Sequence, residues 1–306
     1  MINYCASIDF GTNTARLLIA ELLPAGINSI RVEREVVRLG GGFTDQYGLS
    51  ADAWDRGLAC LHRFSEILSG YSVKNIRASA TSAVRDAVNG RAFVDKVFQD
   101  TGINLEVIDG NMEAELTLLG VLSGLDSKSG TLVMLDVGGG STEFTIATNE
   151  NPVFIKSMPI GVVRLTEGFS TMIEMVERVR TVIDQLENEV SSAGVIVQEG
   201  SILVGTAGTA TTIATIKQEM ENYDYRKVNN FTVDRTDIDE IFQRLLKLSP
   251  QQRLSIKGLE KGREDLIIAG LIIITSVMDK FGFNRLKVSD FGLLEGLALS
   301  GNNQIN

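Results

Sequence analysis

The segment from Thr131 to Phe144 (TLVMLDVGGGSTEF) combines residue types that could bind phosphate and a divalent cation. Its apolar start, Leu132–Leu135, is typical of a buried central strand, which would end at Asp136. Because glycine has no Cβ, a glycine turn can present its backbone N–H groups to a phosphate. Asp136 and Glu143 are hard oxygen donors suited to Mg²⁺ bridged to phosphate oxygens. An ordinary glycine hairpin is the alternative; the turn residues are Gly138, Gly139, Gly140, Ser141 and Thr142.

A segment near the N-terminus repeats the order of strand, aspartate, small polar turn and strand. Ala6–Ile8 leads into Asp9, and after a turn that contains Asn13 and Thr14 the residues Ala15–Leu22 again read as a strand. Asp9 and Asp136 lie 127 positions apart. Because the pattern occurs twice, the interpretation of both turns as phosphate-binding loops is strengthened.

Other landmarks recur at nearly the same offset. Val36–Leu39 returns as Val162–Leu165, and Arg77–Ser82 returns as Leu203–Gly208, each about 126 positions later. Three landmarks in one order and at one spacing predict two halves of like topology. We therefore expect two loops that face each other across a cleft, with Asp9 and Asp136 on opposite walls.

A third small-residue loop, Gly205–Thr211, enters a predicted helix. Its N–H groups and the helix N-terminus would form a second anion site in that half. A tight strand-to-helix packing turn is the alternative interpretation. The positions of interest in this loop are Gly205, Thr206, Gly208 and Thr209.

A hydrolase needs a base that can take a proton from water, and the chain contains a single histidine, His62. Carboxylates are therefore the main candidates. Glu113 lies in the first turn of a helix predicted over Met112–Ser123, after Asp109, at the expected domain boundary. Glu115 is nearly as good a candidate, and the helix dipole alone also favours a glutamate in a first turn.

Arginines near these motifs could grip phosphate with two parallel hydrogen bonds. A surface ion pair is an equally good interpretation of any one of them. They are Arg16, Arg38, Arg85, Arg164 and Arg263.

Periodicity indicates an α/β protein of two domains. Helices are predicted over Ala51–Ser69 and Met172–Ser192, and the glycine-bounded segment Gly124–Gly130 is the clearest linker. We place the domains at residues 1–124 and 125–292. A final helix over residues 293–306 would pack back on the first domain.

The composition excludes several classes. The net charge is −10 without a basic block, which argues against nucleic-acid binding. Cys5 and Cys60 give no disulfide framework and suggest a reducing compartment. The longest apolar run, Leu266–Met278, is too short to span a bilayer, and the N-terminus lacks a signal-peptide pattern, so we expect a cytoplasmic protein without a membrane partner.

Eight motifs along the chain, taken in order, resemble those of a known protein family. They are Asp9-x-Gly-x-Asn-x-x-Arg16-Leu, Ala80-Thr81-x-Ala-x-Arg85, Gly110-x-x-Glu113-Ala, Asp136-x-Gly-Gly-Gly-Ser-Thr-Glu143, Pro159-x-Gly-x-x-Arg164-Leu, Gly205-Thr-Ala-Gly-Thr-Ala, Gly262-Arg263-x-Asp265 and Ser289-Asp-x-Gly-Leu-x-Glu295-Gly. The chain resembles the exopolyphosphatase and guanosine pentaphosphate phosphohydrolase family over essentially its whole length, in the short two-domain form. The resemblance implies duplicated ribonuclease-H-like domains of the actin, sugar kinase and heat-shock chaperone superfamily, flanking a cleft.

The resemblance also implies a reaction and roles. Glu113 would activate water, and Asp136 and Glu143, together with Asp9, would hold Mg²⁺. The remaining positions would contact the phosphate chain: Asn13, Thr14, Arg16, Arg38, Thr81, Arg85, Arg263 and the two glycine loops. The substrate would be short polyphosphate or guanosine pentaphosphate, the latter linked to the stringent response, and a homodimer is the assembly considered.

The chain departs from the family pattern at three places. Met112 replaces an acid, Leu294 replaces an arginine, and Asn229-Asn230 replaces a His-Gly pair. These departures put substrate preference in question. An ATP-dependent small-molecule kinase, or a nucleotide-gated binding protein that hydrolyses slowly, remains an alternative. Because the charge of −10 offers no basic track, we expect better activity on short substrates than on long polymer.

Overall fold

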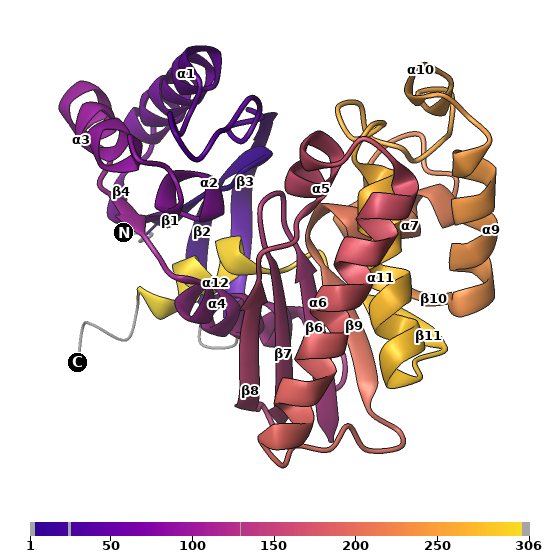
Figure 1. Ribbon diagram of the computed structural model, residues 1–306. Coiled ribbons are helices and arrows are strands. Elements are labelled where there is room, and N and C mark those ends of the chain that lie inside the picture. Colours follow the sequence, from indigo (N-terminus) through magenta and orange to yellow (C-terminus); the bar gives the residue numbers. More distant parts are fainter. Residues whose placement is uncertain (1–3, 24–25, 129, 302–306) are drawn as a thin grey trace. The chain divides into compact units, whose positions relative to one another are not determined.

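The computed structural model describes residues 4–23, 26–128 and 130–301. The chain divides into two compact units (Figure 1). Unit 1 comprises Met1–Ser123 and Gly292–Asn306, and unit 2 comprises Gly124–Phe291. Each unit is an α/β layer structure built on one mixed sheet, as the sequence pattern predicts.

Unit 1 has a five-stranded sheet in the order β3-β2-β1-β4-β5. β1 is antiparallel to β2 and parallel to β4, and β4 is parallel to β5. One face packs on α1 and α3 around fully buried Phe10, Leu61 and Phe93. The elements are β1 Tyr4–Phe10, β2 Thr14–Leu23, β3 Gly26–Val36, α1 Ala51–Ser69, β4 Val73–Ala80, α2 Ser82–Arg85, α3 Gly90–Thr101, β5 Leu105–Val107 and α4 Gly110–Gly124.

The other face of this sheet is covered by the helix α12, Leu293–Ser300, from the far end of the chain. Figure 1 shows this yellow helix beside the indigo strands. Leu294 and Ala298 pack against Cys5, Leu18 and Ala20. Positions 302–306 of the helix predicted over 293–306 lie outside the described residues.

Unit 2 has a six-stranded sheet in the order β10-β11-β9-β6-β7-β8. β6 is parallel to β9 and antiparallel to β7. Its elements are β6 Thr131–Val137, β7 Thr142–Thr148, β8 Asn151–Met158, α5 Val162–Gly168, α6 Met172–Ser192, β9 Ile202–Thr206, α7 Ala207–Lys217, α8 Tyr225–Val228, β10 Thr232–Asp234, α9 Arg235–Leu246, α10 Pro250–Arg253, α11 Ile267–Phe281 and β11 Arg285–Val288.

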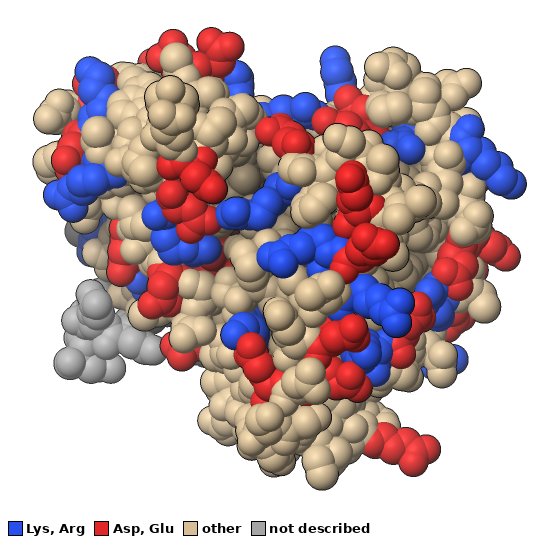
Figure 2. Space-filling model, viewed as in Figure 1, with Lys and Arg blue, Asp and Glu red and all other residues tan. Residues whose placement is uncertain are grey.

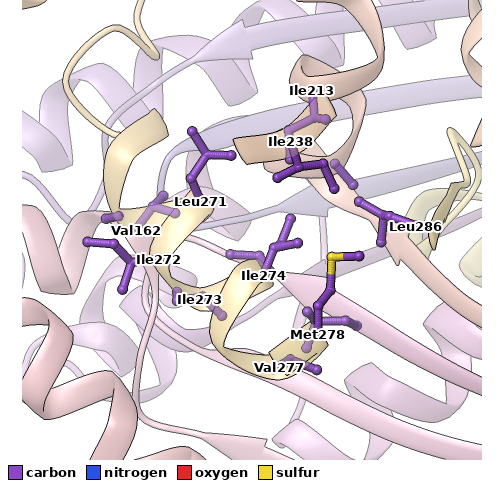
Figure 3. Packing of buried hydrophobic residues seen from close by; sticks show 14 of the residues in the cluster. Val162, Ile213, Ile238, Leu271, Ile272, Ile273, Ile274, Val277, Met278 and Leu286 are labelled. Carbon is purple, nitrogen blue, oxygen red and sulfur yellow. The ribbon is translucent and has the colours of Figure 1, made fainter. Parts of the chain in front are cut away.

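The apolar run predicted as a buried helix forms α11 and lies at the centre of unit 2. Figure 3 shows Leu271, Ile274 and Met278 of this helix among Ile213, Ile238 and Leu286 from other elements. The helix ends at Gly282, which adopts φ 73° and closes the C-terminus in the left-handed conformation. Among the described residues, no helix combines the length and apolarity that crossing a membrane requires.

Strand register confirms the predicted repeat. Asp9 pairs with Arg16 on β2 and with Ser79 on β4. Asp136 pairs with Glu143 on β7 and with Thr206 on β9, each partner 127 positions later. The turns match as well, since Gly11 N donates to Thr14 O (3.1 Å) and Gly138 N donates to Ser141 O (3.0 Å).

One of the landmark pairs differs in local structure. Val36–Leu39 finishes β3 and enters a turn, whereas Val162–Leu165 is the first turn of helix α5. Both segments nevertheless bond back to their glycine turn: Arg38 N donates to Asn13 O (2.9 Å) and Arg164 N to Gly139 O (3.2 Å). The repeat therefore holds in the contacts with the turn rather than in the backbone conformation.

Candidate active site

The turn of unit 2 places two buried carboxylates beside each other. Asp136 at the end of β6 and Glu143 at the start of β7 are directly paired across the antiparallel ladder. Directly opposite residues project to the same face of the sheet, a few ångströms apart. Both are buried, and Ser157 Oγ donates to Glu143 Oε1 at 2.8 Å. Two adjacent buried carboxylates are a donor set suited to a hard divalent cation.

Main-chain contacts fix the shape of the glycine turn. Arg164 Nε donates to Gly140 O (2.9 Å), and Val162 N donates to Gly138 O (3.0 Å). A Cβ at Gly161 would lie 2.4 Å from Gly139 O, so only glycine allows the start of α5 to approach this closely. Arg164 was expected as a possible phosphate ligand, but here its guanidinium holds the loop itself.

The second loop of unit 2 follows the neighbouring strand. Because β6 and β9 are parallel and Asp136 pairs with Thr206, the two loops leave the same edge of the sheet side by side. Thr206 precedes α7 without a side-chain cap, and Ala207 adopts φ 59°. Such a strained non-glycine residue is often found where backbone groups are aimed at a ligand. The glycine turn and the Gly205–Thr209 loop, which the sequence predicts as two separate anion sites, are therefore neighbours in the structure.

Arg263 lies against this second loop. A Cβ at Gly208 would stand 1.7 Å from Arg263 Nη1 and 2.1 Å from its Cζ, so the guanidinium rests directly on the glycine backbone. Arg263 is 8 % exposed, and its Nε donates to Glu260 Oε2 at 2.8 Å. The next residue, Thr209 in the first turn of α7, packs against Gly270 of α11. Arg263 therefore lies on the Gly205–Thr209 loop, and its role as an anion ligand stays a prediction.

The corresponding turn of unit 1 is chemically different. Arg16 donates to Asp9 Oδ2 from Nε (3.2 Å) and Nη2 (2.8 Å), which forms an ion pair across the hairpin. Asn13 Nδ2 donates to Thr14 Oγ1 (3.3 Å). The buried atoms Thr12 Oγ1 and Asn13 Oδ1 find no hydrogen-bond partner within the part of the chain that the structure describes. Because buried polar atoms are normally bonded, they mark this turn as a place for water or ligand.

The predicted base lies at the same edge of the unit 1 sheet. Parallel strands β1, β4 and β5 end near Asp9, Thr81 and Ile108, and α4 starts immediately after β5. Asp109 Oδ1 accepts from Asn111 N (3.0 Å) and Met112 N (2.9 Å), so it caps α4 as predicted. Glu113 follows in the first turn and is 8 % exposed.

Arg85 connects two of the predicted site residues. Its Nη1 donates to Glu113 Oε2 (3.2 Å) and to Ile108 O (3.1 Å). Arg85 ends the short helix α2, which begins after buried Thr81. The contact fixes the direction of the Glu113 carboxylate. Glu115, the alternative base, is exposed.

Arg38 is held in an unusual conformation by a residue that the sequence reading missed. Its φ is 45°, and Arg56 of α1 donates from Nη2 to Arg38 O (3.0 Å) and from Nε to Val37 O (2.9 Å). Arg56 looks like an ordinary surface position of an amphipathic helix. No local pattern indicates a partner 18 positions away.

The three departures from the family pattern have separate structural explanations. Met112 is exposed, and Leu294 is buried in the contact between α12 and the sheet. Asn229 and Asn230 both donate from Nδ2 to Gly124 O, at 2.8 and 2.9 Å. Asn230 has φ 66°, a conformation that glycine adopts freely and asparagine more readily than most residues. The pair thus holds Gly124, the first residue of unit 2.

The residues of unit 2 fit a magnesium ion bound with its substrate. Among the described residues, no three His, Cys, Asp or Glu side chains form a group that could hold a metal. Mg²⁺ usually takes one or two carboxylates and completes its shell with water and phosphate oxygens, which matches Asp136 and Glu143. Asp9 is already engaged by Arg16, so its predicted role as a metal ligand has the weakest support.

A comparison with protein families decides the affiliation. The model of the Ppx/GppA phosphatase family matches residues 18–304. The chain belongs to the Ppx/GppA phosphatase family. This confirms the resemblance and the expectation of an enzyme that hydrolyses phosphoanhydrides. The fold of this family confirms the predicted actin-like duplication.

Individual proteins with similar sequences bear names that agree with this family assignment. Exopolyphosphatase 2 of Mycobacterium tuberculosis is 34 % identical over 96 % of this chain and 97 % of its own length. A bifunctional 3-dehydroquinate synthase/phosphatase of Fusobacterium nucleatum is 35 % identical over 97 % of this chain, which spans only 46 % of that protein. A guanosine-5'-triphosphate,3'-diphosphate pyrophosphatase of Pseudoalteromonas translucida is 28 % identical over 97 % of this chain and 59 % of its own length.

Solved structures are similar over the full chain. An exopolyphosphatase from Cytophaga hutchinsonii superposes with a TM-score of 0.89 at 27 % identity, covering 99 % of both chains. The Aquifex aeolicus member of the Ppx/GppA family superposes with a TM-score of 0.82 at 29 % identity, covering 100 % of this chain and 99 % of that one.

Proposed function

We propose that this protein releases terminal phosphate from short polyphosphate, guanosine pentaphosphate, or both. The observation that carries the proposal lies in unit 2. Two loops leave adjacent parallel strands at one sheet edge, with a carboxylate pair flanking the first loop and a buried arginine packed against the second. This combination supports binding of a phosphate chain together with a divalent cation.

Glu113 is the proposed general base. It is buried at the start of α4 and held by Arg85, so its carboxylate has a fixed position from which it would take a proton from water. Arg85 and the N–H groups of the unit 1 turn would stabilise negative charge on the phosphoryl group. In phosphoryl transfer such positioning and charge stabilisation provide most of the catalysis.

Magnesium is the proposed cofactor, with Asp136 and Glu143 as its protein ligands. When bound, it would neutralise charge on the phosphate oxygens. The protein's own groups do the rest: Ser157 orients Glu143, and Arg164 holds the glycine turn in the shape that presents its N–H groups.

Surface charge supports a preference for short substrates. On the face drawn in Figure 2, basic and acidic side chains are interspersed and form no continuous basic track. Together with the net charge of −10, this disfavours long contact with a polyanion. We therefore propose a higher kcat/KM on chains of a few phosphates than on chains of hundreds. The reverse order would refute this preference.

A kinase of the same superfamily is the second candidate, and acceptor dependence separates it from a hydrolase. The test measures Mg²⁺-dependent phosphate release from short polyphosphate, from guanosine pentaphosphate, and from ATP with a panel of sugars. We expect release from one or both of the first two without an acceptor. Transfer that requires a sugar would identify a kinase, and stoichiometric nucleotide binding without turnover would identify a binding protein.

Two isosteric variants test the base. Glu113→Gln should lower kcat by about a hundredfold or more, whereas Glu115→Gln on the exposed side of the same helix should change it less than about twofold. Activity that survives Glu113→Gln but not Glu115→Gln would assign the role of general base to Glu115. A homodimer and a cytoplasmic location remain predictions.

A further inference from the structure

The guanidinium of Arg253 is buried in unit 2, and no acid of the described residues is in hydrogen-bond contact with it. The residue ends the short helix α10 and is 9 % exposed. Its Nε donates to Leu245 O (3.0 Å) near the end of α9, and its Nη1 donates to Glu264 O (2.8 Å). Burial lowers the pKa of Arg253, and the neighbouring Asp265 opposes that shift.

Such a site is costly for a protein that only needs a filled core. The two carbonyl oxygens accept from Nε and Nη1 but neutralise none of the charge, and a buried cation is expensive unless it is compensated. An apolar side chain of similar volume would avoid this cost. The position of the Glu264 carbonyl in the chain indicates what Arg253 contributes.

Glu264 follows Arg263 directly, in a turn that is bonded at several points. Gly262 N donates to Glu264 Oε2 (2.6 Å), and Arg263 N donates to Glu260 O (3.2 Å). Gly262 has φ 91°, a conformation that favours glycine. Arg253 therefore fastens the main chain one residue beyond the arginine that rests on the Gly205–Thr209 loop.

The contact between the Arg263 guanidinium and the Gly205–Thr209 loop tolerates little displacement of the arginine. Its guanidinium fills the space where a Cβ of Gly208 would stand, and the side chain is almost fully buried. A shift of the turn by about an ångström would move this group off the loop, and misplacement on that scale is sufficient to weaken a bound anion.

We propose that Arg253 is a positioning residue, which acts on a phosphate ligand by fixing the turn that presents Arg263 to the Gly205–Thr209 loop. The inference rests on the proposed function in taking this loop as a phosphate site. It extends that function to a residue that would not itself contact the substrate.

A double-mutant cycle tests the coupling. Arg253→Gln, Arg263→Ala and the double variant are compared by KM and kcat for phosphate release and by Kd for inorganic tripolyphosphate, measured by calorimetry. Arg253→Gln should raise KM and Kd about tenfold with kcat within about twofold, because it removes uniform binding. In the Arg263→Ala background the same change should add less than about twofold. Factors that multiply in the double variant would overturn the proposal.

A matched control separates positioning from loss of stability. Arg235 on α9 pairs with Asp239 and Asp279, and its side chain is 20 % exposed. Arg235→Gln should lower the urea midpoint and leave Kd unchanged. An equal rise in Kd for Arg235→Gln and Arg253→Gln would assign both to destabilisation and refute the inference. If Arg253→Gln does not fold, Arg253→Lys keeps the charge, loses the fork that reaches both carbonyls, and should give the same coupling.

The binding measurement keeps the two proposals apart. A wild-type protein that binds tripolyphosphate but releases no phosphate would refute the proposed hydrolysis. The double-mutant cycle could then still be measured through the Kd for tripolyphosphate. A wild-type protein that does not bind tripolyphosphate would refute the positioning role as well.

Discussion

Arg16 of unit 1 and Glu143 of unit 2 occupy the same position of the duplicated hairpin, and they carry opposite charges. Each lies directly across the ladder from an aspartate, Asp9 or Asp136. In unit 1 the arginine forms an ion pair with the aspartate at 2.8 Å, whereas in unit 2 two carboxylates stand together. One copy therefore pairs its aspartate with a cation from its own chain, whereas the carboxylates of the other copy would need an external cation, which we propose to be Mg²⁺.

This difference predicts where magnesium acts. Asp136→Asn should raise the Mg²⁺ concentration for half-maximal phosphate release at least tenfold, because one of two charged ligands is lost. Asp9→Asn should leave that concentration within about twofold. Magnesium titrations of both variants check the prediction. An equal shift for Asp9→Asn would restore Asp9 to the metal site, as the sequence had suggested.

Gly208 should not tolerate a methyl group. In Gly208→Ala the new Cβ would overlap Arg263, so we expect a destabilisation of about 1–3 kcal/mol and a KM raised about tenfold or more. Gly168→Ala is the matched control, because nothing lies within 4 Å of a Cβ there. Urea unfolding and phosphate-release kinetics measure both. A normal KM for Gly208→Ala would show that Arg263 is not needed on the loop.

Asn229 should stabilise unit 2 through its side-chain amide. Besides its bond to Gly124 O, its Oδ1 accepts from Asp290 N at 3.0 Å. Asn229→Ala should cost about 1–3 kcal/mol, since Asp290 N loses its partner and Gly124 O keeps only the amide of Asn230. Asn229→Asp keeps the acceptor but not the donor, so its stability should lie between those of the wild type and Asn229→Ala. Equilibrium unfolding in urea orders the three proteins, and an Asn229→Ala variant as stable as the wild type would contradict this role.

Cys60 should make stability fall at alkaline pH. Burial raises the pKa of this thiol above its ordinary value near 9, so the unfolded chain ionises first as the pH rises. Stability from this group is complete below pH 9 and is lost above it. Between pH 8 and pH 10.5 the wild type should lose about 2 kcal/mol more than Cys60→Ala. Parallel losses in the two proteins would exclude the thiol as the cause.

Local patterns in the sequence predicted much of the fold. The helices Ala51–Ser69 and Met172–Ser192 have the predicted bounds, because strong amphipathic periodicity and good caps decide both. The two aspartate turns were also found correctly, since each motif is contiguous. Asp9 shows the limit, because its ion pair with Arg16 comes from strand register, which a motif does not encode.

Contacts made over long distances in the chain could not be predicted. Arg164, Arg56 and Arg253 all hold carbonyl groups of site loops from 11 to 24 positions away. In each case a polar side chain on a helix resembles a solvated one until tertiary packing gives it a partner. The same reason explains Val36–Leu39, whose conformation follows from its contact with the turn at Asn13.

The packing of α12 on β1 and β2 has a consequence for synthesis on the ribosome. Ser7 Oγ donates to Leu294 O at 2.6 Å, and the two residues are 287 positions apart. Unit 2 is a single continuous stretch, whereas unit 1 needs residues from both sides of it. The first strands to emerge must therefore wait, with Cys5, Leu18 and Ala20 uncovered, until nearly all of the described chain has been translated.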